Sequence, residues 1–577
     1  MKFRKNFSSK VILLLGVFLI SLPLLSFAGV EKPGPDFVTG CTSFIVGKDA
    51  SADGSTMTTH TADCGHCDNR IIRVPARDHE SGSKRPIYTF RHKYPRIVDA
   101  DRSPGYAPED GQEPLEPIGH IPQVEHTYAY FDGVYGMQNE HGLSMGETTA
   151  AAKTYAKPRP EGKALFHVDS LSRVAMERTK TAREAIKLMG KLAVEHGYYG
   201  WGENLTIVDG EEAWVFEIVA TPNGESAVWV AQRVPDDEFA VLPNIFVIRE
   251  IDFDDPDNFM YSDNIKEVAK DQGWWEEGEP LDFTKVYGGG EYGHPYYSLR
   301  RKWRGLDKLA PSKKFDPYVE GEYTKQYPFS VKPDEPISVR DLFDAQRDYY
   351  QGTQFDLTEG LAAGPFSSPY RWAGGEGEDL VEGAWERPIS VFRCSYTFVM
   401  QVRNDLPDPV KGVTWWGPDA PHSTVYVPFY AGINKIPEAY STGHLSEFTR
   451  DSAWWAFDFV SNWAHLKFSY MIEDIKEKQE EIESKELAMQ PAIDQAAKSL
   501  YEQDPELARE FLTDYSVRNA NEVVDQWWDF ADHLIVKYND GYVNKPELAK
   551  GVGYPAEWLE KVGYDEGPTS YEEPEEE

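Results

Sequence analysis

The order in which strand-like and helix-like segments follow one another limits the folds open to this chain of 577 residues. Short β-prone runs bounded by turn residues dominate from 41 to 242, apart from a stretch with helical spacing at 167–193. A second helical stretch covers 454–538. Because the two kinds of segment come in blocks and do not alternate regularly, the pattern favours an α+β fold of layered sheets and helices over a doubly wound parallel sheet.

Hydrophobic periodicity predicts the individual elements. Residues 76–124 are rich in Pro, Gly and charge and are expected to form a long surface excursion, and 252–336 is expected to hold loops and short helices. The charged run 473–486 is expected to be a solvated helix face. Strands are predicted at 41–47, 56–60, 127–130, 142–145, 205–208, 213–218, 227–232, 238–242, 390–402 and 423–427.

The first 28 residues have the composition of a secretory signal peptide. A basic start is followed by an apolar run at 11–27, and small residues flank Phe27 at the alternate positions that signal peptidase prefers. A retained membrane anchor is the alternative, but the run is short and contains Pro23. We therefore expect an exported protein, periplasmic or secreted, without stable membrane insertion after signal cleavage.

The charge balance narrows the range of partners. The chain has 59 Lys and Arg against 96 Asp and Glu, which gives a formal net charge of -37. Such a surface repels phosphate backbones and anionic lipid, so no nucleic acid is expected as a partner, and neither is a membrane surface. The sequence leaves open whether the protein is a homo-oligomer.

Four cysteines occur, too few for a framework of disulfides in a chain of this size. Cys64 and Cys67 form a CxxC motif, for which we expect a local disulfide in an oxidising compartment. Redox catalysis is less favoured because no thioredoxin-like unit surrounds the motif, and zinc because no convincing fourth ligand is present. Cys394 is expected to be a packed core thiol.

Cys41 admits three interpretations. It could be a buried small hydrophobe, a lipid-modified cysteine within the sequence VTGC at 38–41, or a nucleophile that becomes N-terminal after cleavage behind Gly40. A lipid-modified cysteine is disfavoured because charged residues and prolines separate this motif from the apolar run.

Cleavage between Gly40 and Cys41 would place a nucleophile and a base on one residue. An α-amine has a pKa of about 7.7–8.0 and a thiol one of about 8.5, so the amine can accept the thiol proton near neutral pH. Gly40 suits a strained scissile peptide because it tolerates backbone conformations that other residues avoid. This chemistry predicts attack on an amide carbonyl and a thioester acyl-enzyme, with no metal and no cofactor.

Residues 41–56 read CTSFIVGKDASADGST, and WVFEI at 214–218, WVAQRVPDD at 229–237 and YVPFYAG at 426–432 follow in the same chain. The motif at Cys41 resembles the opening of the dipeptidase A family of cysteine dipeptidases, and the later motifs are further matches to that family. The resemblance implies the N-terminal nucleophile hydrolase superfamily, to which penicillin V acylase and bile salt hydrolase also belong. It also implies a four-layer αββα fold, here with a helical C-terminal region, and cleavage of dipeptides with broad side-chain tolerance.

The resemblance assigns roles to single residues. Asp63 matches the acidic residue that contacts the nucleophile's amine, and Asn244 matches the polar residue that helps to bind the oxyanion. Arg393 is a candidate for the late arginine of related acylases. His60 stands where the family usually has arginine, and an imidazole cannot replace a guanidinium fork, so a different substrate range or pH dependence is expected. Glu147 is a candidate for binding a substrate amine, with a simple surface carboxylate as the alternative.

These observations predict an exported cysteine dipeptidase that acts on small peptides. A hydrolase of N-acyl amino acids or related conjugated amides is the alternative on the same fold. A non-catalytic peptide- or glycan-binding envelope protein is a third class, suggested by tryptophan pairs such as Trp415-Trp416, although such pairs more often pack in cores. The expected organisation is a signal peptide at 1–28, a propeptide at 29–40, an N-terminal nucleophile hydrolase domain at 41–450, a helical region at 451–548 and an acidic tail at 549–577.

Overall fold

A computed structural model describes residues 40–291, 296–319, 327–372, 380–381, 383–545 and 548–566. The expected signal peptide, the expected propeptide except Gly40, and residues 567–577 of the expected tail lie outside the described residues. All described residues belong to one compact unit, Val38–Glu577.

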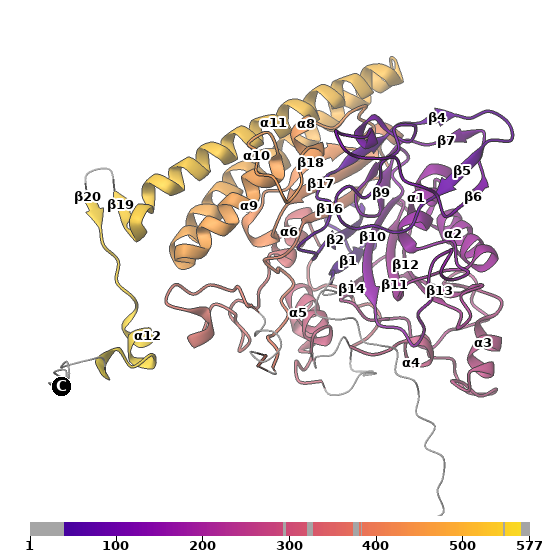
Figure 1. Ribbon diagram of the computed structural model, residues 1–577, viewed down its shortest axis with the longest axis horizontal. Helices are drawn as coiled ribbons and strands as arrows, with labels where there is room; N and C mark the ends of the chain where they lie inside the picture. The colour runs from indigo at the N-terminus through magenta and orange to yellow at the C-terminus, as the bar shows by residue number, and fades with distance from the viewer. Residues whose placement is uncertain are drawn as a thin grey trace, which may run out of the picture. The chain divides into compact units, whose positions relative to one another are not determined.

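The first of two large antiparallel sheets contains the beginning of the described chain (Figure 1). Its six strands follow the order β14-β1-β2-β16-β17-β18. The hairpin predicted from the first two β-prone runs is confirmed as β1 (Ser43–Val46) and β2 (Thr56–Thr61). All six residues of β2 are buried although five of them are polar, because β2 lies between two strands and faces the second sheet, where Thr58 bonds Thr206 at 2.6 Å. The other strands are β14 (Phe239–Leu242), β16 (Tyr396–Val402), β17 (Gly412–Pro418) and β18 (Val427–Tyr430).

The second sheet has eight strands in the order β15-β13-β12-β11-β10-β9-β8-β3. Along its strand β12 (Ala213–Ala220), Trp214, Phe216 and Ile218 belong to one hydrophobic cluster, whereas Val215 and Val219 belong to another. Successive side chains of a strand point to opposite faces, so both faces of this sheet are buried. Its other strands are β3 (Ile72–Val74), β8 (Tyr130–Asp132), β9 (Gly136–Asn139), β10 (Ser144–Ala150), β11 (Gly202–Val208), β13 (Ala227–Val234) and β15 (Phe259–Tyr261).

Two helices pack on the eight-stranded sheet through the cluster that contains Trp214. They are α1 (Val168–Arg178) and α2 (Ala182–His196). The helical spacing predicted at 167–193 is confirmed, but it is divided between two helices because Thr181 starts a new one. Its side chain accepts a hydrogen bond from the Glu184 N–H while Glu184 reaches back to the Thr181 N–H, which is a capping box.

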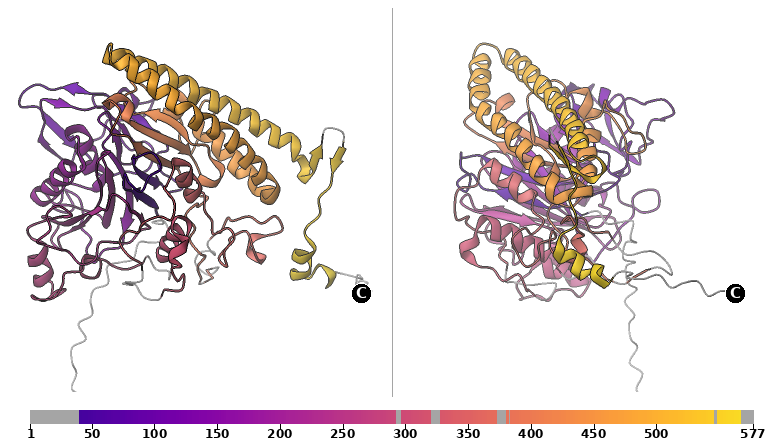
Figure 2. Two further views of the ribbon diagram at one scale, coloured as in Figure 1. Left: turned by 180° about the vertical axis from the view of Figure 1, so that it is seen from behind. Right: turned by 90° about the vertical axis from the view of Figure 1, so that its left-hand side faces the viewer.

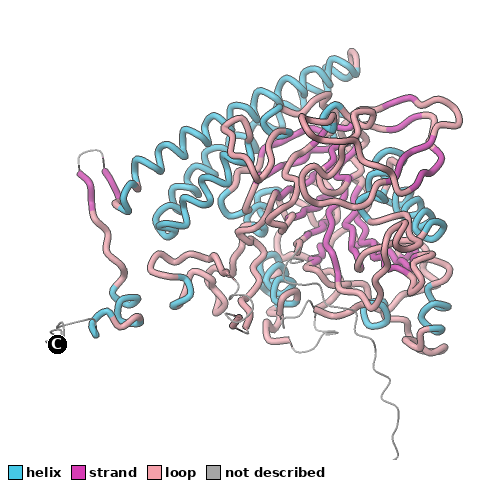
Figure 3. Tube along the Cα trace, in the orientation of Figure 1, coloured by secondary structure: helices cyan, strands magenta, loops and turns pink. Residues whose placement is uncertain are grey.

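Three C-terminal helices confirm the helical spacing predicted at 454–538. They are α9 (Ala453–Ala464), α10 (Phe468–Tyr501) and α11 (Pro505–Lys537). The long helices α10 and α11 run side by side as an antiparallel pair (Figures 2 and 3) and pack against β18 of the six-stranded sheet. Trp527 of α11 is fully buried, as are Trp415 and Trp416 of β17, so the packing interpretation of these tryptophans is confirmed.

The prediction of a solvated helix face at 473–486 is wrong for two of its glutamates. Glu483 and Glu486 are buried. The Glu483 carboxylate pairs with Arg347 and accepts the Tyr426 N–H at 3.0 Å. Glu486 accepts a hydrogen bond from the Tyr515 hydroxyl at 2.9 Å. These carboxylates therefore connect α10 to the sheet and to α11.

Five further local predictions need correction. The strand predicted at 423–427 is mostly loop: Ser423 ends a short 3-10 helix, Pro421–Ser423, and the strand begins only at Val427. Only the second half of 390–402 is strand, and the run at 142–145 belongs to a strand that continues to Ala150. The segment at 127–130 is split between β7 (His126–Thr127) and β8. The stretch 76–124 is not wholly superficial, since Ile87, Tyr106 and Ile121 are buried.

The remaining helices and strands are short. Helices occur, as predicted, within 252–336. Among the described residues, no helix combines the length and the apolar character needed to cross a membrane. These elements are β4 (Arg77–Asp78), β5 (Lys84–Ile87), β6 (Gly119–Pro122), β7 (His126–Thr127), α3 (Ile265–Asp271), α4 (Phe283–Tyr287), α5 (Leu299–Leu309), α6 (Val339–Gln346), α7 (Asp408–Lys411), α8 (Glu438–Ser441), β19 (Val543–Lys545), β20 (Leu548–Lys550) and α12 (Ala556–Lys561).

Candidate active site

Cys41 lies just before β1, at the edge where the two large sheets face each other. β1 pairs antiparallel with β14, with Ser43 opposite Leu242. Continuing this register by two residues places Cys41 opposite Asn244, and the Cys41 N–H donates to Asn244 Oδ1 at 3.0 Å. Asn244 has a φ of 65°, a left-handed conformation that asparagine adopts more readily than most residues. The strand pairing therefore brings together two residues 203 positions apart.

Arg301 of α5 holds both members of this pair. Its Nη1 donates to the Cys41 carbonyl oxygen at 2.7 Å and to Thr42 Oγ1 at 2.8 Å, and its Nη2 donates to Asn244 Oδ1 at 2.8 Å. Burial lowers the pKa of Arg301 to about 10, so the guanidinium keeps its charge at neutral pH. Because Arg301 donates to Asn244 Oδ1, the amide nitrogen of Asn244 must point the other way.

Asp63 lies two residues after β2 and is fully buried. Thr61 Oγ1 donates to Asp63 Oδ2 at 2.9 Å, and Arg387 Nη2 forms a short ion pair with the same oxygen. Arg393 Nη1 donates to the Asp63 carbonyl oxygen at 2.7 Å. The guanidinium that pairs with this aspartate thus comes from Arg387, far along the chain, and not from the position three residues before it.

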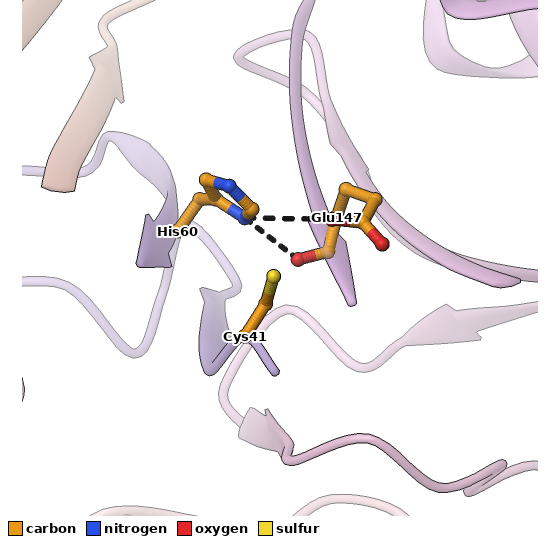
Figure 4. A group of neighbouring side chains, drawn as sticks. All are labelled: Cys41, His60 and Glu147. Carbon is orange, nitrogen blue, oxygen red and sulfur yellow. Dashed lines mark hydrogen bonds and ion pairs between the residues drawn. The ribbon is translucent and has the colours of Figure 1, made fainter. Parts of the chain in front are cut away.

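His60 and Glu147 lie beside the Cys41 sulfur (Figure 4). Each of the three side chains has one atom that could bind a metal, and these three atoms all lie within 4.8 Å of one another. His60 Nδ1 is 2.7 Å from the Glu147 carbonyl oxygen and 3.9 Å from Glu147 Oε2. Glu147 is 1% exposed, so the alternative of a surface carboxylate is wrong. Burial lowers the pKa of His60, against the attraction of Glu147, which keeps the imidazole neutral at neutral pH.

The electrostatic surroundings keep the Cys41 thiol protonated while Cys41 is bonded to Gly40. Burial, followed by the charges of Glu147 and Asp63, raises the pKa of Cys41 well above its usual value, whereas a hydrogen bond from the Asp63 main chain lowers it. A buried thiol among carboxylates is a poor nucleophile unless a base next to it takes the proton.

The donor set of Cys41, His60 and Glu147 suits zinc, which binds thiolate, imidazole and carboxylate together. We expect micromolar Zn²⁺ to inhibit hydrolysis about tenfold or more, EDTA to restore it, and Mg²⁺ at the same concentration to have no effect because Mg²⁺ prefers oxygen ligands. Calorimetric titration of wild type and Cys41→Ala checks this. Equal zinc binding by both proteins would show that the site lies elsewhere.

The other cysteines behave as predicted. Cys64 and Cys67 form a disulfide. Cys394 is buried and free, and its thiol donates to the Tyr396 carbonyl oxygen.

Four of the five other predicted site residues, Asp63, Asn244, His60 and Glu147, contact Cys41 or lie next to it, whereas Arg393 donates to the Asp63 main chain. Three charged residues of the site were not predicted: Arg301, Arg387 and Glu203. Arg301 lies in a stretch expected to hold loops and short helices. The run LRRKWRGLDKL at 299–309 contained the missing signal, an amphipathic helix with arginines next to its apolar positions.

A model of peptidase family C69 matches residues 40–481 of the chain. The chain belongs to peptidase family C69. The match begins one residue before Cys41 and contains every predicted site residue of this C69 peptidase, which confirms the resemblance to dipeptidases. A probable dipeptidase of Latilactobacillus sakei is 28% identical over 435 residues, which cover 74% of this chain and 80% of that protein. A probable dipeptidase of Salmonella dublin is 27% identical, over 74% of this chain and 88% of that protein. Dipeptidase A of Lactobacillus helveticus is 26% identical, over 70% of this chain and 78% of that protein.

Proposed function

We propose that this chain is an exported cysteine dipeptidase in which Cys41 is an N-terminal nucleophile. The observation that carries the proposal is the set of contacts around Cys41. Asn244 accepts from its nitrogen, Arg301 donates to its carbonyl oxygen, and the Asp63 main chain meets its thiol. The relatives named dipeptidases, with which the chain shares most of its length, supply the substrate class.

Maturation starts from the bond between Gly40 and Cys41. The thiol attacks the Gly40 carbonyl carbon, a carbon–sulfur bond forms, the carbon–nitrogen bond breaks, and the thiol proton passes to the departing amine. Water then cleaves the resulting thioester and releases the chain that ends at Gly40. Gly40 lies tightly in the site, since a β-carbon there would be 2.4 Å from the Tyr297 hydroxyl.

Hydrolysis repeats this chemistry on a dipeptide. The new α-amine takes the thiol proton, the thiolate attacks the peptide carbonyl, and the leaving amine takes up a proton. Asn244 Nδ2 donates one hydrogen to the Thr149 carbonyl oxygen at 2.7 Å, which leaves its second hydrogen for the oxyanion. The buried Asp63 carboxylate stabilises the protonated amine. Water then releases the acyl residue from the thioester.

The proposal includes a four-layer αββα arrangement of the N-terminal nucleophile type. It is supported by α1 and α2, which pack on the eight-stranded sheet, and by α9, α10 and α11 on the side of the six-stranded sheet. Strands of the two sheets contact each other directly, among them β2 and β10.

Export is supported by two independent features. The first 28 residues have the order of a signal peptide, and the Cys64–Cys67 disulfide suits an oxidising compartment. The working enzyme then lacks residues 1–40.

The direct test combines intact mass, N-terminal sequencing and an assay of amino-acid release from dipeptides. We expect the purified protein to begin at Cys41 and to hydrolyse dipeptides, and brief acid quenching during turnover to trap a protein heavier by one acyl residue. An active protein that keeps residues N-terminal to Cys41 would contradict the proposed nucleophile. A processed protein that releases no amino acid from any dipeptide would contradict the proposed substrate class.

The close packing around Gly40 predicts that a β-carbon at this position slows processing. Gly40→Ala adds a β-carbon that meets the Tyr297 hydroxyl at 2.4 Å and Arg387 Nη2 at 3.1 Å, so either the scissile peptide or these side chains of the site must shift. We expect processing to slow about tenfold or more, because small displacements of reacting atoms have large effects on rate. Gly65→Ala is the matched control, since its nearest contact is 3.8 Å away. Equal processing rates of the two variants, followed by mass spectrometry, would show that Gly40 is not held in a reactive position.

A further inference from the structure

A second buried carboxylate, Glu203, lies next to Glu147. On the eight-stranded sheet, Glu203 of β11 is directly opposite Thr149 of β10. Glu147 is two residues before Thr149 and therefore points to the same face of the sheet. Glu203 is 2% exposed and Glu147 is 1% exposed. Burial, and next the charge of Glu147, raises the pKa of Glu203 well above its usual value.

The described residues offer these two carboxyl groups little compensation. The basic side chains nearest to them there are both histidines: His60 Nδ1 is 3.9 Å from Glu147 Oε2, and His167 Nε2 is 3.6 Å from Glu203 Oε1. Burial lowers the pKa of His60, so this imidazole supplies no positive charge at neutral pH. The Oε2 atom of each glutamate is buried without a hydrogen-bond partner within the described parts of the chain. Thr149 Oγ1 donates to Glu147 Oε1 at 3.1 Å, but neither Oε2 atom has such a donor among the described residues. A buried carboxyl oxygen without a donor is unfavourable, which favours the binding of a cationic donor there during function.

The distance between this carboxyl pair and Cys41 indicates which cationic group binds to the pair. A Glu147 carboxylate oxygen lies within 4.8 Å of Cys41 Sγ. In an aminoacyl thioester the α-nitrogen is two bonds from the carbonyl carbon, which places it about 3 Å from the sulfur. It is thus within hydrogen-bonding reach of a carboxylate at the position of Glu147. Tyr135 and Met145 line a small cavity beside Glu147 and His60 and offer no competing charge.

We propose that Glu147 and Glu203 form the subsite for the α-ammonium group of the substrate residue that becomes acylated to Cys41. A dipeptide then binds with its N-terminal residue on the Glu147 side of the sulfur and requires a free N-terminus. This inference rests on the proposed dipeptidase function and extends it. A substrate with a neutral group in place of the ammonium leaves the carboxyl pair without its donor, and sites that bind a polar group in this way reject analogues lacking it by large factors.

The test compares two substrates of nearly equal size. L-Alanyl-L-alanine carries the ammonium group, and propionyl-L-alanine has hydrogen in its place. For the processed wild-type enzyme we expect kcat/KM to be about 10³-fold higher for the dipeptide. Glu147→Gln should lower this preference about tenfold or more, because the neutral amide removes a charge that attracts the ammonium group, and Glu203→Gln should lower it less, because the pKa of Glu203 is raised.

Glu217→Gln is the matched control. Glu217 is a buried glutamate on the neighbouring strand β12. Its carboxyl group accepts a hydrogen bond from the Val247 N–H at 2.6 Å, a contact that does not involve Cys41. Burial raises the pKa of Glu217 to about 8, so glutamine resembles its protonated form and the preference should not change.

The outcomes separate this inference from the proposed function. Equal kcat/KM values for the two substrates in wild type would overturn the inference and leave the dipeptidase intact, and this comparison does not depend on any variant being folded. A Glu203→Gln enzyme that loses activity equally on both substrates would show a structural role and would also overturn it. A processed wild type that cleaves only propionyl-L-alanine, or neither substrate, would contradict the proposed function and the inference together.

Discussion

Replacing Cys41 by alanine is expected to abolish dipeptide hydrolysis and to leave the residues that precede it attached. The thiol is the only group of the protein that bonds to the carbonyl carbon in the proposed mechanism, and loss of a nucleophile lowers kcat by about 10⁴-fold or more in comparable hydrolases. The fold should persist, because the contacts of Asn244 and Arg301 with Cys41 involve its main chain. Released amino acids, intact mass and thermal unfolding of the same preparation measure all three expectations.

Cys394→Ala is the matched control for this experiment. Cys394 is the other free cysteine among the described residues, and it is also buried. Its thiol donates to the Tyr396 carbonyl oxygen and also lies beside Asp63, so this variant alters the surroundings of Asp63 and keeps the nucleophile. We expect normal processing and activity within a factor of about three. Substantial activity in Cys41→Ala, or an equal loss in Cys394→Ala, would show that the reaction does not depend on the Cys41 thiol.

Arg301→Lys is expected to have the second-largest effect. The guanidinium donates to Cys41, Thr42 and Asn244 in a fixed planar arrangement that one ammonium group cannot reproduce. With Asn244 no longer fixed, the loss of an aligned oxyanion donor should lower kcat about 10²–10³-fold. KM should change far less, because Arg301 is bonded to the protein and not to the substrate.

Arg300→Lys provides the comparison for this variant. Arg300 is the preceding residue of α5, is equally buried, and forms an ion pair with Glu386 at 3.3 Å. Both variants exchange a buried arginine on the same helix, so a similar fall in the unfolding temperature is expected for each. Only Arg301→Lys should also lose kcat. Equal kcat values for the two variants would remove Arg301 from the proposed catalytic arrangement.

Local patterns predicted the fold best where one segment decided the outcome. The hairpin at 41–60 and the helical spacing at 454–538 depend on periodicity within the segment, and the structure contains both. The break between α1 and α2 was missed because the apolar residues before and after Thr181 share one helical spacing. The buried Glu483 was missed because its partner, Arg347, lies 136 residues away.

The residues of the candidate site also fall into two groups, those that one local motif contains and those that only tertiary contacts bring close to Cys41. Cys41, Asp63 and His60 lie within one short hairpin and its continuation, so a motif of 23 residues contains them. Glu147 and Asn244 follow from resemblance. Their distances to Cys41 depend on the pairing of β1 with β14 and on the facing of β2 toward β10, neither of which any local pattern specifies.

The sequence by itself determined the α+β class, the CxxC disulfide and the chemical candidate Cys41, because each depends on residue types at short spacing. Only the tertiary structure decided which charges surround that thiol. Arg301, Arg387 and Glu203 come from a helix, a loop and a strand that meet only after the sheets pair. Their burial strengthens their electrostatic interactions with immediate neighbours, since a carboxyl pair or a guanidinium removed from water is screened less. Short-range patterns do not contain that information, because the partners are chosen by packing across the whole chain.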